Sequence, residues 1–416
     1  NSFCTLLAMF SLNRPPGGAN GLDIERLLHG NRVCPTDAMV RSCGDSPSVD
    51  SLSSQPETLR MAVLSSYVVD WEWLATILPA SVGDAVTVAV NWLPETRDSE
   101  NPICCFGVGS RVVPICPDAE RTVRVVHPVI GKGLMHAKLG VLRFDTFARM
   151  FVTTANLTLD DWAQLGQGTW VFDAPISNTA APTSDESAAF ADNFSGDLQR
   201  ALALLGLEAQ GRAALQGVDL TGTRCRLVIS APHTIAQGAM ELFRFDDSAS
   251  DSGDHEIPGA DLDAAESLPT EASRAAYRSL AGGNNGLGSL RCAVAAARSI
   301  VEESTVRLNA GANAAIDWQA APAIYQASSV GGITDDVLGE LDASVGAPVH
   351  VVFPSVGSVQ RQLEAGFLGA ITLRCFQMSN STLYRQRWHD LTTALPFHSK
   401  ILFHEVSLSP RPAEGQ

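Results

Sequence analysis

The clearest alternation of apolar and polar positions lies between residues 136 and 162, and it predicts a β-hairpin. One predicted arm is Ala137 to Phe144, which is rich in apolar residues. The other is Met150 to Thr154, which is dense in β-branched residues. The turn is expected over Asp145 to Ala148.

Three polar side chains should meet at the open end of this hairpin. Successive strand residues point to opposite faces, so His136 and Lys138 share one face. A turn centred near Thr146 brings Asn156 roughly opposite His136. The pattern therefore predicts that an imidazole, an ammonium and a carboxamide converge on one spot.

Strands and helices alternate in the rest of the chain, so we expect an α/β fold. The halves are residues 1–222 and 223–416, and each sheet should end near one His-x-Lys motif. The first apolar run, Phe3 to Phe10, is a candidate strand. The other predicted strands are 85–90, 123–130, 224–231, 349–353 and 371–376. The predicted helices are 24–28, 61–78, 190–205, 287–303, 358–365 and 383–393. Asp192 or Asn193 is the expected N-cap of the helix over 190–205.

The second His-x-Lys motif is His398-Ser399-Lys400, followed by an apolar run that predicts a last strand. The chain has nine His and three Lys, which give roughly 0.06 such pairs by chance, whereas two are found. Lys is a compact point charge suited to a single phosphate oxygen, and the remaining 26 basic residues are Arg. Both motifs are therefore candidate phosphate sites.

Charge is unevenly distributed along the chain. The net charge of −16 argues against a protein that coats nucleic acid without selectivity. Residues 246–266 hold eight acids without Lys or Arg, and we expect a flexible insertion there, away from the site. Residues 111–149 hold seven basic and three acidic residues, so the first motif lies in a locally basic setting.

Cysteine usage and hydropathy limit the setting. The nine Cys include no Cys-x-x-Cys, which favours a reducing, intracellular environment without zinc. No His, Asp and Glu cluster has metal-ligand spacing. No apolar run approaches the length of a membrane span. The sequence begins at Asn1 without Met, so we expect further residues upstream.

The residues around the first motif resemble the tyrosyl-DNA phosphodiesterase family of the phospholipase D superfamily. That family has His-x-Lys followed, after seventeen residues, by Asn, as in His136, Lys138 and Asn156. Similar stretches continue through the chain in the same order. They are Asp70-Trp71, Ala155-Asn156-Leu157, Asp161-Trp162, Gln167-Gly168-Thr169-Trp170, Ser328-Ser329-Val330-Gly331, Phe353-Pro354-Ser355-Val356 and Pro396-Phe397-His398-Ser399-Lys400.

The resemblance implies two similar α-β-α sandwich domains, related by pseudo-twofold symmetry, with the active site between them. It implies a nucleophilic His136 that forms a phosphohistidine and a His398 that acts as acid and then base. Lys138, Asn156 and Lys400 would bind the phosphoryl oxygens, Gln167 would orient His136, and Ser328 and Ser329 would hold the DNA backbone.

The resemblance also implies the partners. These are DNA with a 3′-phosphotyrosyl or another 3′ adduct and a topoisomerase-derived peptide, bound by a monomer in the nucleus. No cofactor, metal or membrane is needed for this chemistry, because two histidines with flanking donors suffice.

Two departures from the family pattern keep alternatives open. The family completes its second motif with an Asn and then a Glu, but no Asn lies between Lys400 and Gln416. The family also tends to place an aromatic residue just before the first His, where this chain has Met135. A phospholipase D-like enzyme with another phosphodiester substrate and a non-catalytic DNA-binding fragment therefore remain alternatives.

Individual residues also have purely structural interpretations. Asn156 and the Ser328-Ser329 pair could be turn residues, since Asn and Ser are common after strands. Gln167 could bind backbone groups alone. The tryptophans at 71, 73, 162 and 170 are expected in the core.

Overall fold

The structure is a computed structural model. It describes residues 10–12, 24–28, 30, 57–91, 109–114, 121–128, 135–163, 167–177, 193–220, 223, 226–229, 290–291, 293–295, 298, 323–326, 334–352, 355, 357, 360, 364, 382–389 and 401–404.

Eight strands of the first half form one mixed sheet in the order β1-β8-β7-β6-β2-β3-β5-β4. The pairs β2/β3 and β3/β5 are parallel and the other pairs are antiparallel. The strands are β1 (Phe10–Leu12), β2 (Met61–Ser66), β3 (Val86–Val90), β4 (Gly109–Pro114), β5 (Thr122–His127), β6 (Leu139–Arg143), β7 (Phe147–Thr153) and β8 (Gly168–Pro175).

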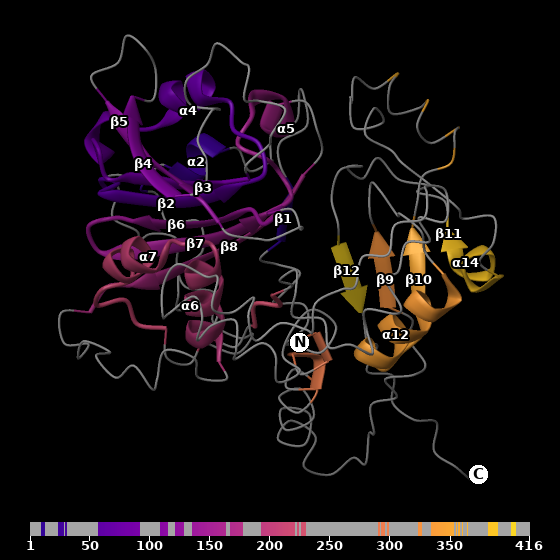
Figure 1. Cartoon of the computed structure of the whole chain (residues 1–416). Helices are drawn as coiled ribbons and strands as arrows, with labels where there is room; N and C mark the ends of the chain where they lie inside the picture. The colour runs from indigo at the N-terminus through magenta and orange to yellow at the C-terminus, as the bar shows by residue number, and fades with distance from the viewer. Residues whose placement is uncertain are drawn as a thin grey trace, which may run out of the picture.

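Helices cover both faces of this sheet (Figure 1). Leu27, Trp71 and Trp162 lie in one apolar core, to which α2 (Ile24–Leu28), α4 (Trp71–Ile77) and α5 (Leu159–Ala163) contribute. Phe194 and Ala214 lie in the other, to which α6 (Phe194–Leu204) and α7 (Glu208–Ala214) contribute. A short 3-10 helix, η2 (Ala80–Val82), leads into β3. The first half is thus an α-β-α sandwich.

A smaller sheet lies beside the first in Figure 1, and all its described strands come from the second half. Its order is β11-β10-β9-β12, with strands β9 (Ala323–Gln326), β10 (Val349–Val352), β11 (Trp388–His389) and β12 (Ile401–His404). The helices α12 (Asp335–Val345) and α14 (Thr382–Arg387) accompany it. Val345, Ala347 and Val349 belong to its small buried core.

The smaller sheet repeats the arrangement of four strands of the larger one. In the larger sheet, β6 runs antiparallel to β2, and β2, β3 and β5 follow in parallel. In the smaller sheet, β12 runs antiparallel to β9, and β9, β10 and β11 follow in parallel. The chain order is also the same, and the last strand of each set begins directly after the Lys of a His-x-Lys motif.

Most of the predicted strands and helices are confirmed where the structure describes them. The hairpin is formed by β6 and β7, although its turn is shorter than predicted because β7 already begins at Phe147. Asn193 is the cap of α6 and accepts a hydrogen bond from the backbone N–H of Gly196 at 2.9 Å. Strands β3, β5, β10 and β12 lie close to their predicted positions, as does helix α2.

The helix predicted over residues 61–78 is wrong in its first part and confirmed from Trp71 to Ile77. Met61–Ser66 is the strand β2, and the helix α4 begins only at Trp71. Five of the six β2 residues are buried, because the sheet has helices on both of its faces at this strand. Such a strand carries a continuous apolar run without alternation. The carboxylate of Asp70 caps α4 by accepting from the N–H of Trp73 at 3.0 Å.

Other predicted boundaries also differ. Residues 226–229 of the predicted 224–231 strand are not in a strand; Arg226 instead forms an ion pair with Asp197 at 2.7 Å. The helix predicted over 383–393 ends at Arg387, and β11 begins at the next residue, Trp388. β4 and β8 were not predicted. Helix is present at the described positions of 287–303 and 358–365, whereas 371–376, 3–9 and the acidic stretch 246–266 lie outside the described residues.

Candidate active site

The hairpin register brings the first motif and Asn156 together. Leu139 on β6 pairs with Val152 on β7, and the N–H of Thr153 donates to the carbonyl of Lys138 at 3.0 Å. Continuing this register places Ala155 opposite His136, so Asn156 lies one position beyond it. The register thus differs by one residue from the predicted pairing of Asn156 with His136, and the convergence of the carboxamide on the imidazole stays a prediction.

His136 and Lys138 contact each other directly. The Nζ of Lys138 lies 3.0 Å from Nδ1 of His136 and donates to the His136 carbonyl at 3.1 Å. Lys138 is buried whereas His136 is exposed, so the imidazole is the member of the pair that faces outward. An ammonium beside an exposed imidazole can hold a phosphoryl oxygen close to a nitrogen nucleophile.

Tyr67 forms one wall of this pair, although the sequence patterns did not point to it. Its ring centroid lies 4.8 Å from that of His136, with 32° between the planes, and 6.0 Å from Nζ of Lys138. Tyr67 directly follows β2, the strand beside β6. An aromatic ring therefore lies at the motif, supplied by a neighbouring strand and not by the residue before His136.

Ser65 fixes the backbone of the motif. Its hydroxyl accepts from the N–H of Leu139 at 2.9 Å and lies 3.2 Å from the Ala137 carbonyl, to which it can donate. Its neighbour Ser66 accepts from the N–H of Leu157 at 2.9 Å, just after Asn156. Hydrogen bonds from the end of β2 therefore hold both the segment after Lys138 and the segment after Asn156.

Asp161 holds Asn156 in place. Its Oδ2 accepts from the Asn156 backbone N–H at 2.6 Å and from the Asn156 side-chain Nδ2 at 2.9 Å. The indole Nε1 of Trp162 donates to the Asn156 carbonyl at 2.8 Å. Both partners lie in α5, so one short helix orients the carboxamide. These contacts also settle which end of the amide is the donor.

Gln167 is fully buried at the start of β8. Its Oε1 accepts from the hydroxyl of Thr154 at 2.6 Å, two residues before Asn156. Nearby, the hydroxyls of Thr153 on β7 and Thr169 on β8 form a hydrogen bond at 2.8 Å. Gln167 therefore supports the strand end that carries Asn156.

The second half of the predicted site lies outside the described residues. This applies to His398, Lys400, Ser328 and Ser329. The neighbouring described residues are Ile401, which directly follows Lys400, and Gln326, which precedes Ser328 by two positions. These two residues are paired partners on β12 and β9.

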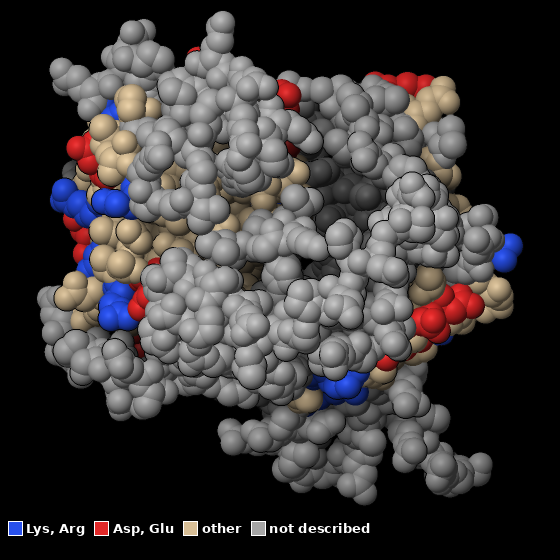
Figure 2. All heavy atoms as spheres, in the orientation of Figure 1, with Lys and Arg blue, Asp and Glu red and all other residues tan. Residues whose placement is uncertain are grey.

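The described residues hold neither a metal-binding cluster nor a membrane-spanning helix. No group of three or more His, Cys, Asp and Glu side chains is arranged to hold a metal ion in this part of the chain. Among its helices, none has the length and apolar character needed to cross a membrane. Figure 2 shows acidic and basic side chains interspersed around the described surface on this face.

A model of the tyrosyl-DNA phosphodiesterase family matches residues 41–244, a range that includes His136, Lys138, Asn156 and Gln167. The chain belongs to this family. Its members are phosphodiesterases, which are hydrolases. No curated protein sequence matches the chain.

The chain is similar to solved structures of the yeast tyrosyl-DNA phosphodiesterase. One is 12% identical over 95% of this chain and 79% of its own, with a TM-score of 0.50. A mutant of the yeast protein is 13% identical over 84% of this chain and 75% of its own, with a TM-score of 0.45. The first of these likenesses supports a family-like fold over most of the chain.

Proposed function

We propose that the chain hydrolyses tyrosyl and related adducts at DNA 3′ ends through a phosphohistidine intermediate, as a repair enzyme of the nucleus. The observation that carries this proposal is the 3.0 Å approach of Lys138 Nζ to the exposed imidazole of His136. A nucleophile and a phosphate-binding cation thus share one spot. Membership of a phosphodiesterase family supports the same function.

In the first step, an imidazole nitrogen of His136 attacks phosphorus, and the bond from phosphorus to the tyrosyl oxygen breaks. The proposed acid, His398, gives its proton to that leaving oxygen. The nitrogen–phosphorus bond that forms joins the DNA end to the enzyme. One difficult displacement becomes two easier ones.

In the second step, His398 takes a proton from water, and the water oxygen attacks the same phosphorus. The nitrogen–phosphorus bond breaks, which leaves a 3′-phosphate on the DNA and restores His136. Both steps need donors on the non-bridging oxygens, and we assign this role to Lys138, Asn156 and Lys400.

The contact of Lys138 with Nδ1 suggests how substrate prepares the nucleophile. Without phosphate, the ammonium donates to the ring and to the His136 carbonyl. A phosphoryl oxygen that takes this donor releases the imidazole. Asn156 is already oriented by Asp161, so it needs no comparable movement. Gln167, one position before β8, would orient His136 across β7, which lies between β8 and β6, and Ser328 and Ser329 would hold the DNA backbone.

We further propose that residues 1–222 and 223–416 are two phospholipase D-like domains related by a pseudo-twofold axis, with the site between them. The repeated four-strand arrangement supports this division. The two motifs also precede equivalent strands, β6 and β12. The partners would be adduct-bearing DNA and the peptide left by a topoisomerase, bound by a monomer.

The test uses an end-labelled oligonucleotide with a 3′-phosphotyrosyl group and a denaturing gel. His136→Ala removes the nucleophile, so no protein–DNA adduct can form. His398→Ala leaves attack possible, because a phenolate departs with less protonation. Release then lacks its base, and a slow-migrating adduct should accumulate.

The reverse gel pattern would exchange the roles of the two histidines. A wild-type chain that binds the oligonucleotide without cleaving it would favour a non-catalytic binding module. Cleavage of another phosphodiester at a higher rate would favour a different substrate for the same phospholipase D-like chemistry.

A further inference from the structure

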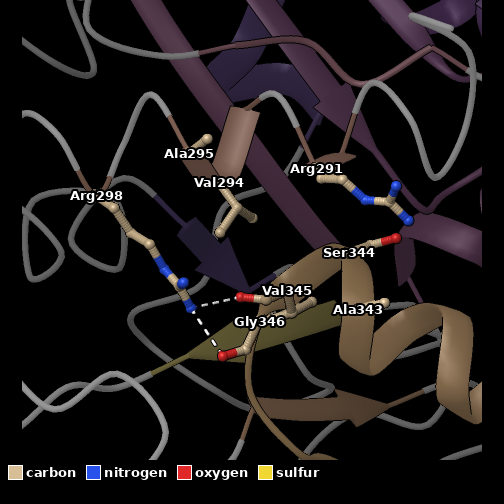
Figure 3. A pocket seen from close by; sticks show the side chains of 8 residues that line it. All are labelled: Arg291, Val294, Ala295, Arg298, Ala343, Ser344, Val345 and Gly346. Atoms are coloured by element: carbon tan, nitrogen blue, oxygen red, sulfur yellow. Dashed lines mark hydrogen bonds between the residues drawn. The ribbon is translucent and has the colours of Figure 1, made fainter.

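A cavity of about 300 Å³ lies in the second half, away from the hairpin (Figure 3). One wall consists of the helical residues Arg291, Val294, Ala295 and Arg298, and the other is the last turn of α12 with Gly346. Val294 and Ala295 make part of the lining apolar, and Arg291, Arg298 and Ser344 supply its polar groups. Cavities of this size accommodate small organic ligands.

Ser344 carries the strongest sign of a ligand. The residue is 2% exposed, and its hydroxyl has no hydrogen-bond partner among the described residues. A buried hydroxyl without a partner costs about 1–3 kcal/mol. Figure 3 shows its oxygen pointing toward the Arg291 side of the cavity. A ligand acceptor at this place would remove that cost.

Arg291 is able to turn toward such a ligand. Its guanidinium lies 3.5 Å from the carboxylate of Glu340, and both side chains are well exposed, at 57% and 42%. Exposed ion pairs of this kind contribute about 0–1 kcal/mol. A bidentate contact with an oxyanion is stronger, so Glu340 is a weak competitor.

Arg298 supplies a fixed positive charge on the opposite side. Its Nη2 donates to the carbonyls of Val345 and Gly346 at 2.6 and 3.2 Å, where α12 ends. The carbonyl end of a helix carries about half a negative charge, which alone would repel an anion. The guanidinium of Arg298 lies against those carbonyls and opposes their partial negative charge.

We propose that this cavity binds a phosphoryl group carried by a small organic moiety, with Ser344 and Arg291 as donors and Arg298 as a fixed charge. The apolar side of the cavity would pack against the organic part. The phosphoryl group can come from a free nucleotide or from a phosphorylated nucleic-acid end, since both present the same oxygens.

The test is titration calorimetry on the full chain with three probes. These are inorganic phosphate, a mononucleoside monophosphate and a short oligonucleotide with a terminal phosphate. His136→Ala with Lys138→Ala serves as background, so that phosphate bound at the hairpin does not contribute. On this background we expect Ser344→Ala and Arg291→Gln each to weaken binding about tenfold. The matched control is Arg212→Gln, because Arg212 is also an exposed helical arginine paired with a Glu.

Two further measurements distinguish a ligand site from a purely structural role of Ser344. Ser344→Ala should leave the melting temperature of the unliganded protein unchanged or raise it, since it removes an unsatisfied buried group. Binding of the mononucleotide alone would identify a free ligand, and binding of the oligonucleotide would identify a nucleic-acid end. Binding unchanged by Ser344→Ala and Arg291→Gln, or no binding of any probe at millimolar concentration, would overturn the proposal without affecting the hairpin site.

Discussion

One carboxylate oxygen of Asp161 accepts two hydrogen bonds from Asn156, from its backbone N–H at 2.6 Å and from its side-chain Nδ2 at 2.9 Å. The carboxamide is therefore held before any substrate arrives. Pre-organised donors of this kind act on the charge that develops in a transition state.

Asp161→Asn should lower kcat by about tenfold to a hundredfold with little change in KM, because the Asn156 donor loses its charged anchor. The measurement is steady-state cleavage of a 3′-phosphotyrosyl oligonucleotide. Asp160→Asn is the control, since Asp160 is the exposed neighbour on the same helix. Equal losses in the two variants would contradict a positioning role for Asp161.

The ring of Tyr67 should matter more than its hydroxyl. Tyr67→Ala removes the wall 4.8 Å from the His136 ring and should slow phosphohistidine formation about tenfold, because the imidazole can then rotate. Tyr67→Phe keeps the ring and should stay within about twofold of the wild type. Rapid quenching of the first turnover measures this rate. A Phe variant as slow as the Ala variant would assign the effect to the hydroxyl.

Arg149 and Asp173 form a fully buried bidentate pair at 2.7 and 2.8 Å, and Arg149 also donates to the Leu27 carbonyl at 2.8 Å. Asp173→Ala should destabilise the protein by about 3–5 kcal/mol, since it leaves a buried charge without its counter-ion. Urea unfolding monitored by tryptophan fluorescence provides the measurement.

The exposed pair Arg60–Asp145 is the control for this prediction, because its N···O distance is also 2.7 Å. Asp145→Asn should cost less than about 1 kcal/mol. A similar loss in both variants would mean that burial does not decide the strength of these pairs.

The pair His350–His389 should make the smaller sheet sensitive to acid. Nδ1 of His350 lies 2.5 Å from Nε2 of His389, and the ring centroids are 4.8 Å apart. The rings therefore contact each other through these nitrogens, although their planes are nearly parallel. Burial, followed by the charges of His389 and Arg387, lowers the pKa of His350 from its ordinary 6.5, whereas Asp342 opposes this shift.

A lowered pKa of His350 in the folded state favours its neutral ring. The contribution of this ring to the free energy of unfolding is therefore fully present above the pKa of His350 in the unfolded chain, and it is lost as the pH falls through the pKa in the folded state. The protection factors of the β11 amides, which compare the observed exchange with the intrinsic rate at each pH, should therefore fall below about pH 6.5, and His389→Gln should flatten that dependence. Hydrogen exchange between pH 7.5 and 5 measures the effect. The same pH slope in wild type and variant would refute the coupling.

The sequence was sufficient for the chemistry of the hairpin, because that site depends on local register. Two arms joined by a short turn have one antiparallel pairing that keeps their apolar faces buried, so counting residues places His136 and Asn156 at the same end of the hairpin. Family membership and the fold of the first half agree with what the motifs implied.

The contacts that support the site were harder to predict, because they come from other elements. Tyr67 and Ser65 reach it from β2, which was itself mistaken for a helix. One signal was present in the sequence: Ser65-Ser66 at the end of β2 is repeated as Ser328-Ser329 just after β9. Asp161 lies five positions after Asn156 in the sequence. This spacing predicts a contact only when the position of α5 against the segment around Asn156 is known.

The hairpin separates its turn from its chemistry by the full length of β6 and β7. Asp145 and Thr146 connect the two strands at one end, and His136, Lys138 and Asn156 lie at the other. A fluorophore or an affinity tag introduced at the turn would therefore sit up to about 30 Å along the chain from His136, given about 3.4 Å per extended residue. An insertion confined to the turn would preserve the pairing of β6 with β7, whereas one residue added within β7 would shift that pairing by one position.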